Sequence, residues 1–103
     1  MIIDTQLEGL VATAVDIAAL FLIGAFLLAS VRLILGPTLP DRVVALDLLT
    51  MLVVAFLTLF TLATGVGAYL DAALALALVG FLATIAFARF VDLTPGQNPG
   101  ERR

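Results

Sequence analysis

The sequence predicts an all-α membrane protein of three transmembrane helices, with its N-terminus outside the cell and its C-terminus in the cytoplasm. The composition, three long apolar runs and the placement of the arginines carry this prediction. Of the 103 residues, 63% are hydrophobic and 13% are charged. A soluble domain averages roughly 45–50% apolar and about 25% charged residues. The composition therefore indicates that most of the chain contacts lipid or other membrane protein.

Each apolar run is long enough to cross a bilayer. The expected spans are about 8–35, 39–63 and 68–90, and about 20 apolar residues of helix cross a ~30 Å hydrocarbon core. Unpaired backbone groups are costly in lipid, so these runs must be helical, and none alternates as a barrel strand does. We expect residues 1–103 to form one multi-pass subunit of the cell membrane, with a flexible Pro/Gly-rich tail at 91–103.

The arginines orient the three spans. All five basic residues flank the first loop or the end of the third span: Arg32, Arg42, Arg89, Arg102 and Arg103. The N-terminal segment carries only acidic charge, and the second turn near residues 65–69 has no basic residue. Because cytoplasmic loops are enriched in Lys and Arg, the first loop and the C-terminus are expected inside.

The first loop separates the first two helices by proline and glycine chemistry. Gly36 and Pro37 end the first helix, and Pro40 is suited to the first turn of the next. Thr38 is the expected N-cap, with Asp41 three residues later at the positive end of the helix dipole. Gly36, Pro37 and Pro40 are therefore expected to be structural.

Two of the expected helices carry a line of distinctive residues along one face. On the second helix the line is polar: Asp47, Thr50, Val54, Thr58, Thr61 and Gly65. Threonine can bond its own backbone, so this line alone does not define a site. On the third helix the line is small: Ala73, Ala77, Gly80, Thr84 and Ala88. Small residues allow close helix packing in lipid.

Besides Asp41 at the cap, three aspartates fall inside the expected spans. Asp71 lies in the first turn of the third helix, where a carboxylate favours the dipole, so we expect a structural role. Asp16 lies deeper and is expected to face a partner or water, because a mid-span carboxylate costs roughly 2.5–3.5 kcal/mol. Asp47 is the main functional candidate, although it could instead simply pair with Arg42 or Arg32.

Composition also excludes several function classes. The chain has no cysteine and no histidine, which excludes disulfides, thiolate metal sites and imidazole chemistry. The net charge of −3 leaves no basic patch for nucleic acid. We therefore expect no cofactor, no nucleic-acid partner and no enzyme active site.

Residues 32–47, Arg-Leu-Ile-Leu-Gly-Pro-Thr-Leu-Pro-Asp-Arg-Val-Val-Ala-Leu-Asp, form a recognisable segment. The segment resembles the signature of the F subunit of Mrp-type multisubunit cation/proton antiporters. Its core, Gly-Pro-Thr-x-x-Asp-Arg-Val-Val-Ala-Leu-Asp, runs without a gap. Length, three spans and the first cytoplasmic loop match too, so the resemblance covers nearly the whole chain except the tail.

The resemblance implies a role that depends on partners. Mrp antiporters are assembled from several different membrane subunits and exchange cytoplasmic Na⁺, sometimes K⁺ or Li⁺, for external protons, which serves pH homeostasis. The large antiporter-like subunits are expected to carry the proton path. The small E, F and G subunits are expected to shape the cation route. The implied partners are therefore the E and G subunits, the large subunits and membrane lipid.

The resemblance also implies which residues take part. Asp47 carries over as a functional position, and Asp41 and Arg42 carry over more weakly. Thr50 adds a hydroxyl near Asp47, whereas Asp16 lies outside the signature. A hard cation prefers oxygen ligands, so the metal expected is a transient Na⁺ at Asp47, with the remaining ligands supplied by partner subunits.

Two other functions stay open at this point. A membrane-anchor subunit of a related respiratory complex, such as a membrane-bound hydrogenase, uses a similar module. The neighbouring genes would distinguish it from an antiporter subunit. A stand-alone channel or an assembly factor is the other possibility, and the motif does not support it.

Overall fold

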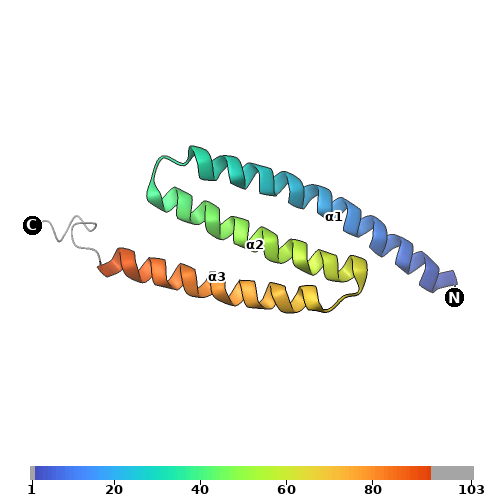
Figure 1. Ribbon diagram of the computed structural model, residues 1–103. Helices are drawn as coiled ribbons and strands as arrows, with labels where there is room; N and C mark the ends of the chain where they lie inside the picture. Colours follow the sequence, from blue (N-terminus) through green and yellow to red (C-terminus); the bar gives the residue numbers. More distant parts are fainter. Residues whose placement is uncertain (1, 94–103) are drawn as a thin grey trace, which may run out of the picture.

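The computed structural model describes residues 2–93, and these form three helices joined by short connections. The helices are α1 (Ile2–Leu35), α2 (Leu39–Thr64) and α3 (Ala68–Leu93). They run antiparallel with α2 in the middle (Figure 1). In the described part of the chain, α1 and α3 each pack on α2 and make no packing contact with each other. The molecule is therefore an open row of helices rather than a closed bundle.

All three helices are long and apolar enough to cross a membrane. At ~1.5 Å per residue, the 34 residues of α1 extend about 51 Å and the 26 residues of α2 about 39 Å. Both lengths exceed the ~30 Å hydrocarbon core of a bilayer. The prediction of an all-α protein with three membrane-spanning helices is confirmed.

The helices extend beyond the expected spans. Helix α1 begins at Ile2, and its first turns project past the end of α2 (Figure 1). Asp4 lies in its first turn, where a negative charge favours the helix dipole. Helix α2 ends one residue later than expected, and α3 continues to Leu93. Residues 91–93, expected in the flexible tail, are therefore helical, and the rest of that tail lies outside the described residues.

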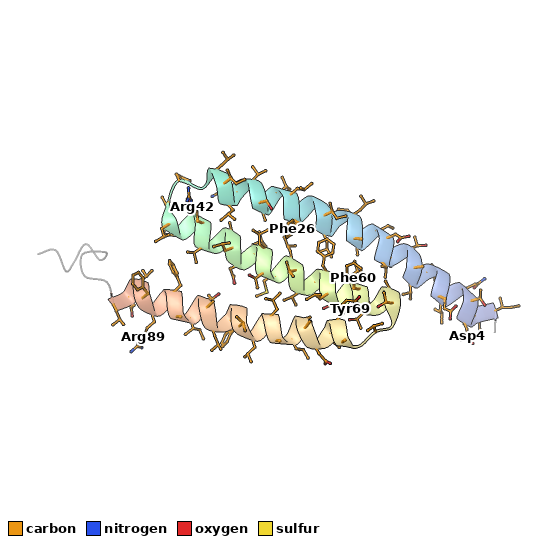
Figure 2. The ribbon with its side chains drawn as sticks, in the orientation of Figure 1. Asp4, Phe26, Arg42, Phe60, Tyr69 and Arg89 are labelled. Atoms are coloured by element: carbon orange, nitrogen blue, oxygen red, sulfur yellow. The ribbon has the colours of Figure 1, made fainter. Side chains whose placement is uncertain are left out.

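Two of the arginines lie at the same end of the row. Arg42, at the start of α2, and Arg89, near the end of α3, lie at one end of the molecule (Figure 2). Asp4 lies at the opposite end. Each helix crosses from one end to the other, so all positions near the first loop and near the end of α3 share one side.

Both connections are closed by capping interactions. Thr38 adopts an extended backbone conformation and caps α2, with its Oγ1 accepting a hydrogen bond from the Asp41 backbone N–H at 3.3 Å. The same hydroxyl donates to Asp41 Oδ2 at 2.8 Å. Gly65 ends α2 in the left-handed conformation (φ 75°), and its N–H donates to the Thr61 carbonyl. Glycine adopts this conformation without steric cost.

Gly36 lies where the first connection is tightest. It is buried, and a Cβ at this position would lie 3.0 Å from the Arg32 carbonyl oxygen and 3.3 Å from Asp41 Cβ. A side chain at position 36 would therefore require its neighbours to shift by a few tenths of an ångström, and glycine avoids this shift.

Small residues form the helix contacts, and large ones face outward. Ala29, Ala45 and Ala73 are at most 3% exposed, and Leu52 is 9% exposed. In contrast, Phe21 is 75% exposed. Small side chains let helix backbones approach closely where lipid removes the hydrophobic drive for association. The larger apolar side chains are left to cover the outer surface of the row.

Candidate functional site

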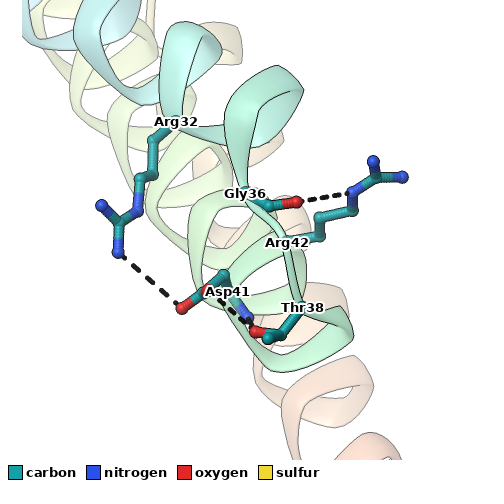
Figure 3. Close-up of polar contacts among 5 residues, drawn as sticks. All are labelled: Arg32, Gly36, Thr38, Asp41 and Arg42. Atoms are coloured by element: carbon teal, nitrogen blue, oxygen red, sulfur yellow. Dashed lines mark hydrogen bonds and ion pairs between the residues drawn. The ribbon is translucent and has the colours of Figure 1, made fainter.

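The first loop contains a cluster of polar contacts around the start of α2 (Figure 3). An Arg32 guanidinium nitrogen lies 3.8 Å from Asp41 Oδ1. Arg42 Nε donates to the Gly36 carbonyl oxygen at 3.3 Å, and the guanidinium points away from Asp41 (Figure 3). An exposed ion pair contributes at most about 1 kcal/mol. The cluster therefore contributes little to the stability of the protein, and its main effect is to orient the loop.

Asp47 takes no part in that cluster. Among the described residues, Arg32 pairs with Asp41, and Arg42 bonds the Gly36 carbonyl. The alternative in which Asp47 pairs with one of these arginines is not what the geometry shows. Asp47 is half-buried and faces the neighbouring helix instead.

The partner of Asp47 is Thr84 on α3. Thr84 Oγ1 donates a hydrogen bond to Asp47 Oδ1 at 3.0 Å, across 37 residues of sequence. The two side chains share a small cavity of about 160 Å³ between α2 and α3. Its lining consists of Val43, Leu46, Asp47, Thr50, Gly80, Ala83 and Thr84. The cavity combines one carboxylate and two hydroxyls with apolar walls.

Close approach of the two helices creates this arrangement. A Cβ on Gly80 would lie 2.9 Å from Thr50 Cγ2, which is too close for a real contact. Because residue 80 is glycine, the two helices come close enough for Thr84 to reach Asp47.

The Thr50 hydroxyl donates its proton to the Leu46 carbonyl oxygen at 3.0 Å, which leaves its lone pairs available.

The comparisons with known proteins identify the family. Residues 40–92 match the family described as Multiple resistance and pH regulation protein F (MrpF / PhaF). The chain belongs to this family. The matched segment holds nearly all of α2 and α3, and with them Asp47, Thr50, Gly80 and Thr84. Gly36 and Pro37 precede it.

The relatives of this MrpF / PhaF member are antiporter components. The F subunit of the Na(+)/H(+) antiporter of Bacillus subtilis (strain 168) is 42% identical over 62 residues, covering 60% of this chain and 66% of the relative. The F1 subunit of the Na(+)/H(+) antiporter of Staphylococcus epidermidis (strain ATCC 12228 / FDA PCI 1200) is 38% identical over 77 residues, covering 74% and 79%. The F1 subunit of Staphylococcus aureus (strain JH9) is 32% identical over 76 residues, covering 74% and 78%.

These names confirm the resemblance to the F subunit and describe a transporter component rather than an enzyme. The respiratory-complex alternative is not favoured by them. The chain spans just under two thirds of the Bacillus relative and more of the staphylococcal ones. No solved structure matches the chain.

Asp16 lies apart from the Asp47 cavity in this MrpF / PhaF chain. It is exposed on α1 and lines a larger cavity of about 630 Å³, together with Glu8 and the end of α2 at Thr64 and Gly65. Asp47 and Thr64 are 17 residues apart on α2, which is about 25 Å at ~1.5 Å per residue. The structure does not bring Asp16 and Asp47 together.

The site thus contains one position that sequence reasoning treated only as packing. Thr84 belongs to the small-residue line of α3, and its hydroxyl reaches the carboxylate on α2. The available signal was a threonine one turn after Gly80, on a face suited to close packing. In the described part of the chain, no group of three acidic, histidine or cysteine residues could hold a metal ion. The cavity offers a carboxylate and hydroxyls only.

Proposed function

We propose that this chain is an integral-membrane subunit of a multisubunit monovalent cation/proton antiporter that exports Na⁺ in exchange for protons. The observation that carries this proposal is the MrpF / PhaF match over residues 40–92, which includes the cavity around Asp47. The names of the relatives support the Na⁺/H⁺ assignment. We place the chain in the cell membrane as a multi-pass protein, in keeping with its three spans.

The partners are the other antiporter subunits, foremost the small E and G subunits and the large antiporter-like subunits. The open row supports this proposal, because α1 and α3 each contact only α2 within the described residues. Large apolar side chains cover their remaining faces, as at Phe21 and Leu78 (60% exposed). Lipid and neighbouring subunits are the surroundings that such faces require.

The cation path passes Asp47. A half-buried carboxylate attracts a cation far more strongly than one in water, because the surrounding dielectric is low. Thr50 adds a hydroxyl oxygen in the same cavity. Asp41 and Arg42 lie one to two turns nearer the start of α2 and shape the approach to it. Asp16 is a separate candidate at the opposite end of the row.

Purification of the complex tests the function. A tagged copy of this chain, purified from native membranes in mild detergent, should bring the other antiporter subunits with it. Everted vesicles with the whole complex should exchange Na⁺ for protons, and vesicles with this chain alone should not. Three helices without a lysine or histidine lack the relay that proton-coupled exchange requires. Co-purification of nickel–iron hydrogenase subunits, or Na⁺/H⁺ exchange by the lone chain, would contradict the proposal.

The end of the row that carries Arg42 and Arg89 faces the cytoplasm. Both arginines lie at that end, and Asp4 lies at the other (Figure 2). By the positive-inside rule, the N-terminus is then outside and the C-terminus inside. In this orientation Asp47 is nearer the cytoplasmic side, about two turns past the start of α2.

Cysteine labelling tests the orientation. The chain has no cysteine, so each introduced thiol is unique in this polypeptide. In intact cells, Thr5→Cys should react with a membrane-impermeant maleimide, and Gln97→Cys should react only after the membrane is opened. The labelled chain is separated from its partners on a denaturing gel. The reverse pattern would overturn the orientation.

A further inference from the structure

The hydroxyl of Thr84 has two acceptors at the same distance. Thr84 Oγ1 lies 3.0 Å from Asp47 Oδ1 and 3.0 Å from the Gly80 carbonyl oxygen one turn earlier on α3. A hydroxyl has one proton and two lone pairs, so it can make one full hydrogen bond as a donor at a time. The two contacts are therefore alternative positions of one proton.

The comparison with the other threonines singles out Thr84. Thr58 donates to the Val54 carbonyl four residues earlier, as threonines in helices commonly do. Thr50 does the same toward Leu46. Thr84 can donate to the same kind of backbone acceptor, the Gly80 carbonyl oxygen, and also to the Asp47 carboxylate on another helix.

We propose that Thr84 is a positioning residue for Asp47 whose hydroxyl proton changes acceptor when a cation binds. This inference rests on the proposed role of Asp47 in the cation path. While no cation is bound to the Asp47 carboxylate, Thr84 donates to Asp47 Oδ1 and holds the Asp47 side chain toward the cavity. When a monovalent cation such as Na⁺ occupies the carboxylate, the proton turns to the Gly80 carbonyl. A lone pair of Oγ1 then faces the cation beside Asp47.

Energetics favour each position in its own state. A hydrogen bond to an ionised acceptor is roughly twice as strong as one between neutral groups, so the empty carboxylate attracts the proton. A cation bound at the Asp47 carboxylate repels a hydroxyl proton that points toward that carboxylate, and it attracts a lone pair of Thr84 Oγ1. The change needs only rotation about the Cβ–Oγ1 bond, because the Gly80 carbonyl is already within reach. No helix has to move.

The same reasoning gives the sign of the effect on affinity. Loss of the hydroxyl removes an oxygen ligand from the bound cation and frees the Asp47 side chain to leave the cavity. It also removes a donor from the empty carboxylate, which acts in the opposite direction. A water molecule can supply the lost donor in a cavity of about 160 Å³ with polar partners, but it does not hold the Asp47 side chain toward the cavity. The net effect is weaker cation binding.

The test compares exchange kinetics of complexes that carry Thr84→Val. This variant keeps the shape of the side chain and removes the hydroxyl. The Na⁺ concentration for half-maximal exchange should rise roughly two- to tenfold, in keeping with one hydrogen-bond-sized interaction. The maximal rate per complex should change less. Thr84→Ser, which restores a hydroxyl, should recover most of the lost affinity.

Thr58→Val is the matched control, because the Thr58 hydroxyl bonds the backbone of its own helix. It should leave the half-maximal Na⁺ concentration unchanged. If Thr84→Val complexes do not assemble, Thr84→Ala removes the same hydroxyl without bulk and is measured instead. An unchanged half-maximal Na⁺ concentration in the variant without the hydroxyl, or a Thr84→Ser variant as impaired as Thr84→Val, would overturn the inference.

The outcomes separate this inference from the proposal on which it rests. If Asp47→Asn abolishes exchange while Thr84→Val behaves like Thr58→Val, then Asp47 is in the path and Thr84 does not position it. If Asp47→Asn exchanges as the wild type does, the path itself does not pass Asp47. Failure of the role of Thr84 and failure of the role of Asp47 therefore give different results in the same vesicle assay.

Discussion

Asp47→Asn should leave the complex assembled and reduce Na⁺/H⁺ exchange more than tenfold. Asparagine has nearly the same size, and its Oδ1 still accepts the hydrogen bond from Thr84, so the contact between α2 and α3 persists. The negative charge is lost. At an effective dielectric constant near 20, two unit charges ~4 Å apart interact by about 4 kcal/mol. About a third of that interaction, ~1.4 kcal/mol, corresponds to a tenfold change in rate.

The measurement is Na⁺-dependent dissipation of a pH gradient in everted vesicles, matched for complex content. Asp47→Glu should keep partial activity, because the charge remains and moves by one methylene. Asp71→Asn is the control, since Asp71 lies in the first turn of α3, 13 residues before Thr84. If Asp47→Asn reduced complex abundance instead, Asp47 would be a structural residue. Wild-type rate and Na⁺ affinity in Asp47→Asn would remove it from the path.

Gly36→Leu should sharply reduce the amount of assembled complex. Any Cβ at this position would be 3.0 Å from the Arg32 carbonyl oxygen and 3.3 Å from Asp41 Cβ. A leucine therefore forces the first connection open, and it also favours continuing α1 past its present end. The Arg42 bond to the Gly36 carbonyl and the Arg32–Asp41 pair depend on the same turn. The relative positions of α1 and α2 would be lost with it.

The abundance of the complex on a native gel measures this effect. Gly67→Leu is the matched control, because Gly67 lies in the other connection and a Cβ there meets no atom within 4 Å. It should assemble near the wild-type level. Equal abundance of Gly36→Leu and Gly67→Leu complexes would contradict a structural role for Gly36. Normal assembly of Gly36→Leu with lost exchange would place the loop in transport instead.

The helices and their caps were predictable because their causes are local. Three apolar runs of sufficient length must be helical in lipid, and proline and glycine mark where each helix ends. Thr38 as a cap follows from its position before Pro40 and Asp41. The Asp41 carboxylate accepts from the Thr38 hydroxyl, and Arg32 lies on its other oxygen.

The family was predictable for a related reason. The segment from Gly36 to Asp47 combines a helix end, a cap and a carboxylate about two turns into the next helix, and it can be recognised without knowledge of the tertiary structure. The choice of Asp47 over Asp71 was also local, because the two carboxylates lie at different distances from a helix start. The roles of the candidate residues in transport remain proposals.

By itself the sequence determined how many helices there are, where the two connections between them lie and to which family the chain belongs. Only the tertiary structure decided that α2 lies between α1 and α3, that Gly80 lets two helices approach closely, and that Asp47 meets Thr84 rather than an arginine or Asp16. The physical reason is the lipid environment. In water, an apolar stripe shows which face of a helix is buried. In these helices large apolar side chains remain on the exposed faces, so rotation and register are set by small residues and a few polar contacts between helices.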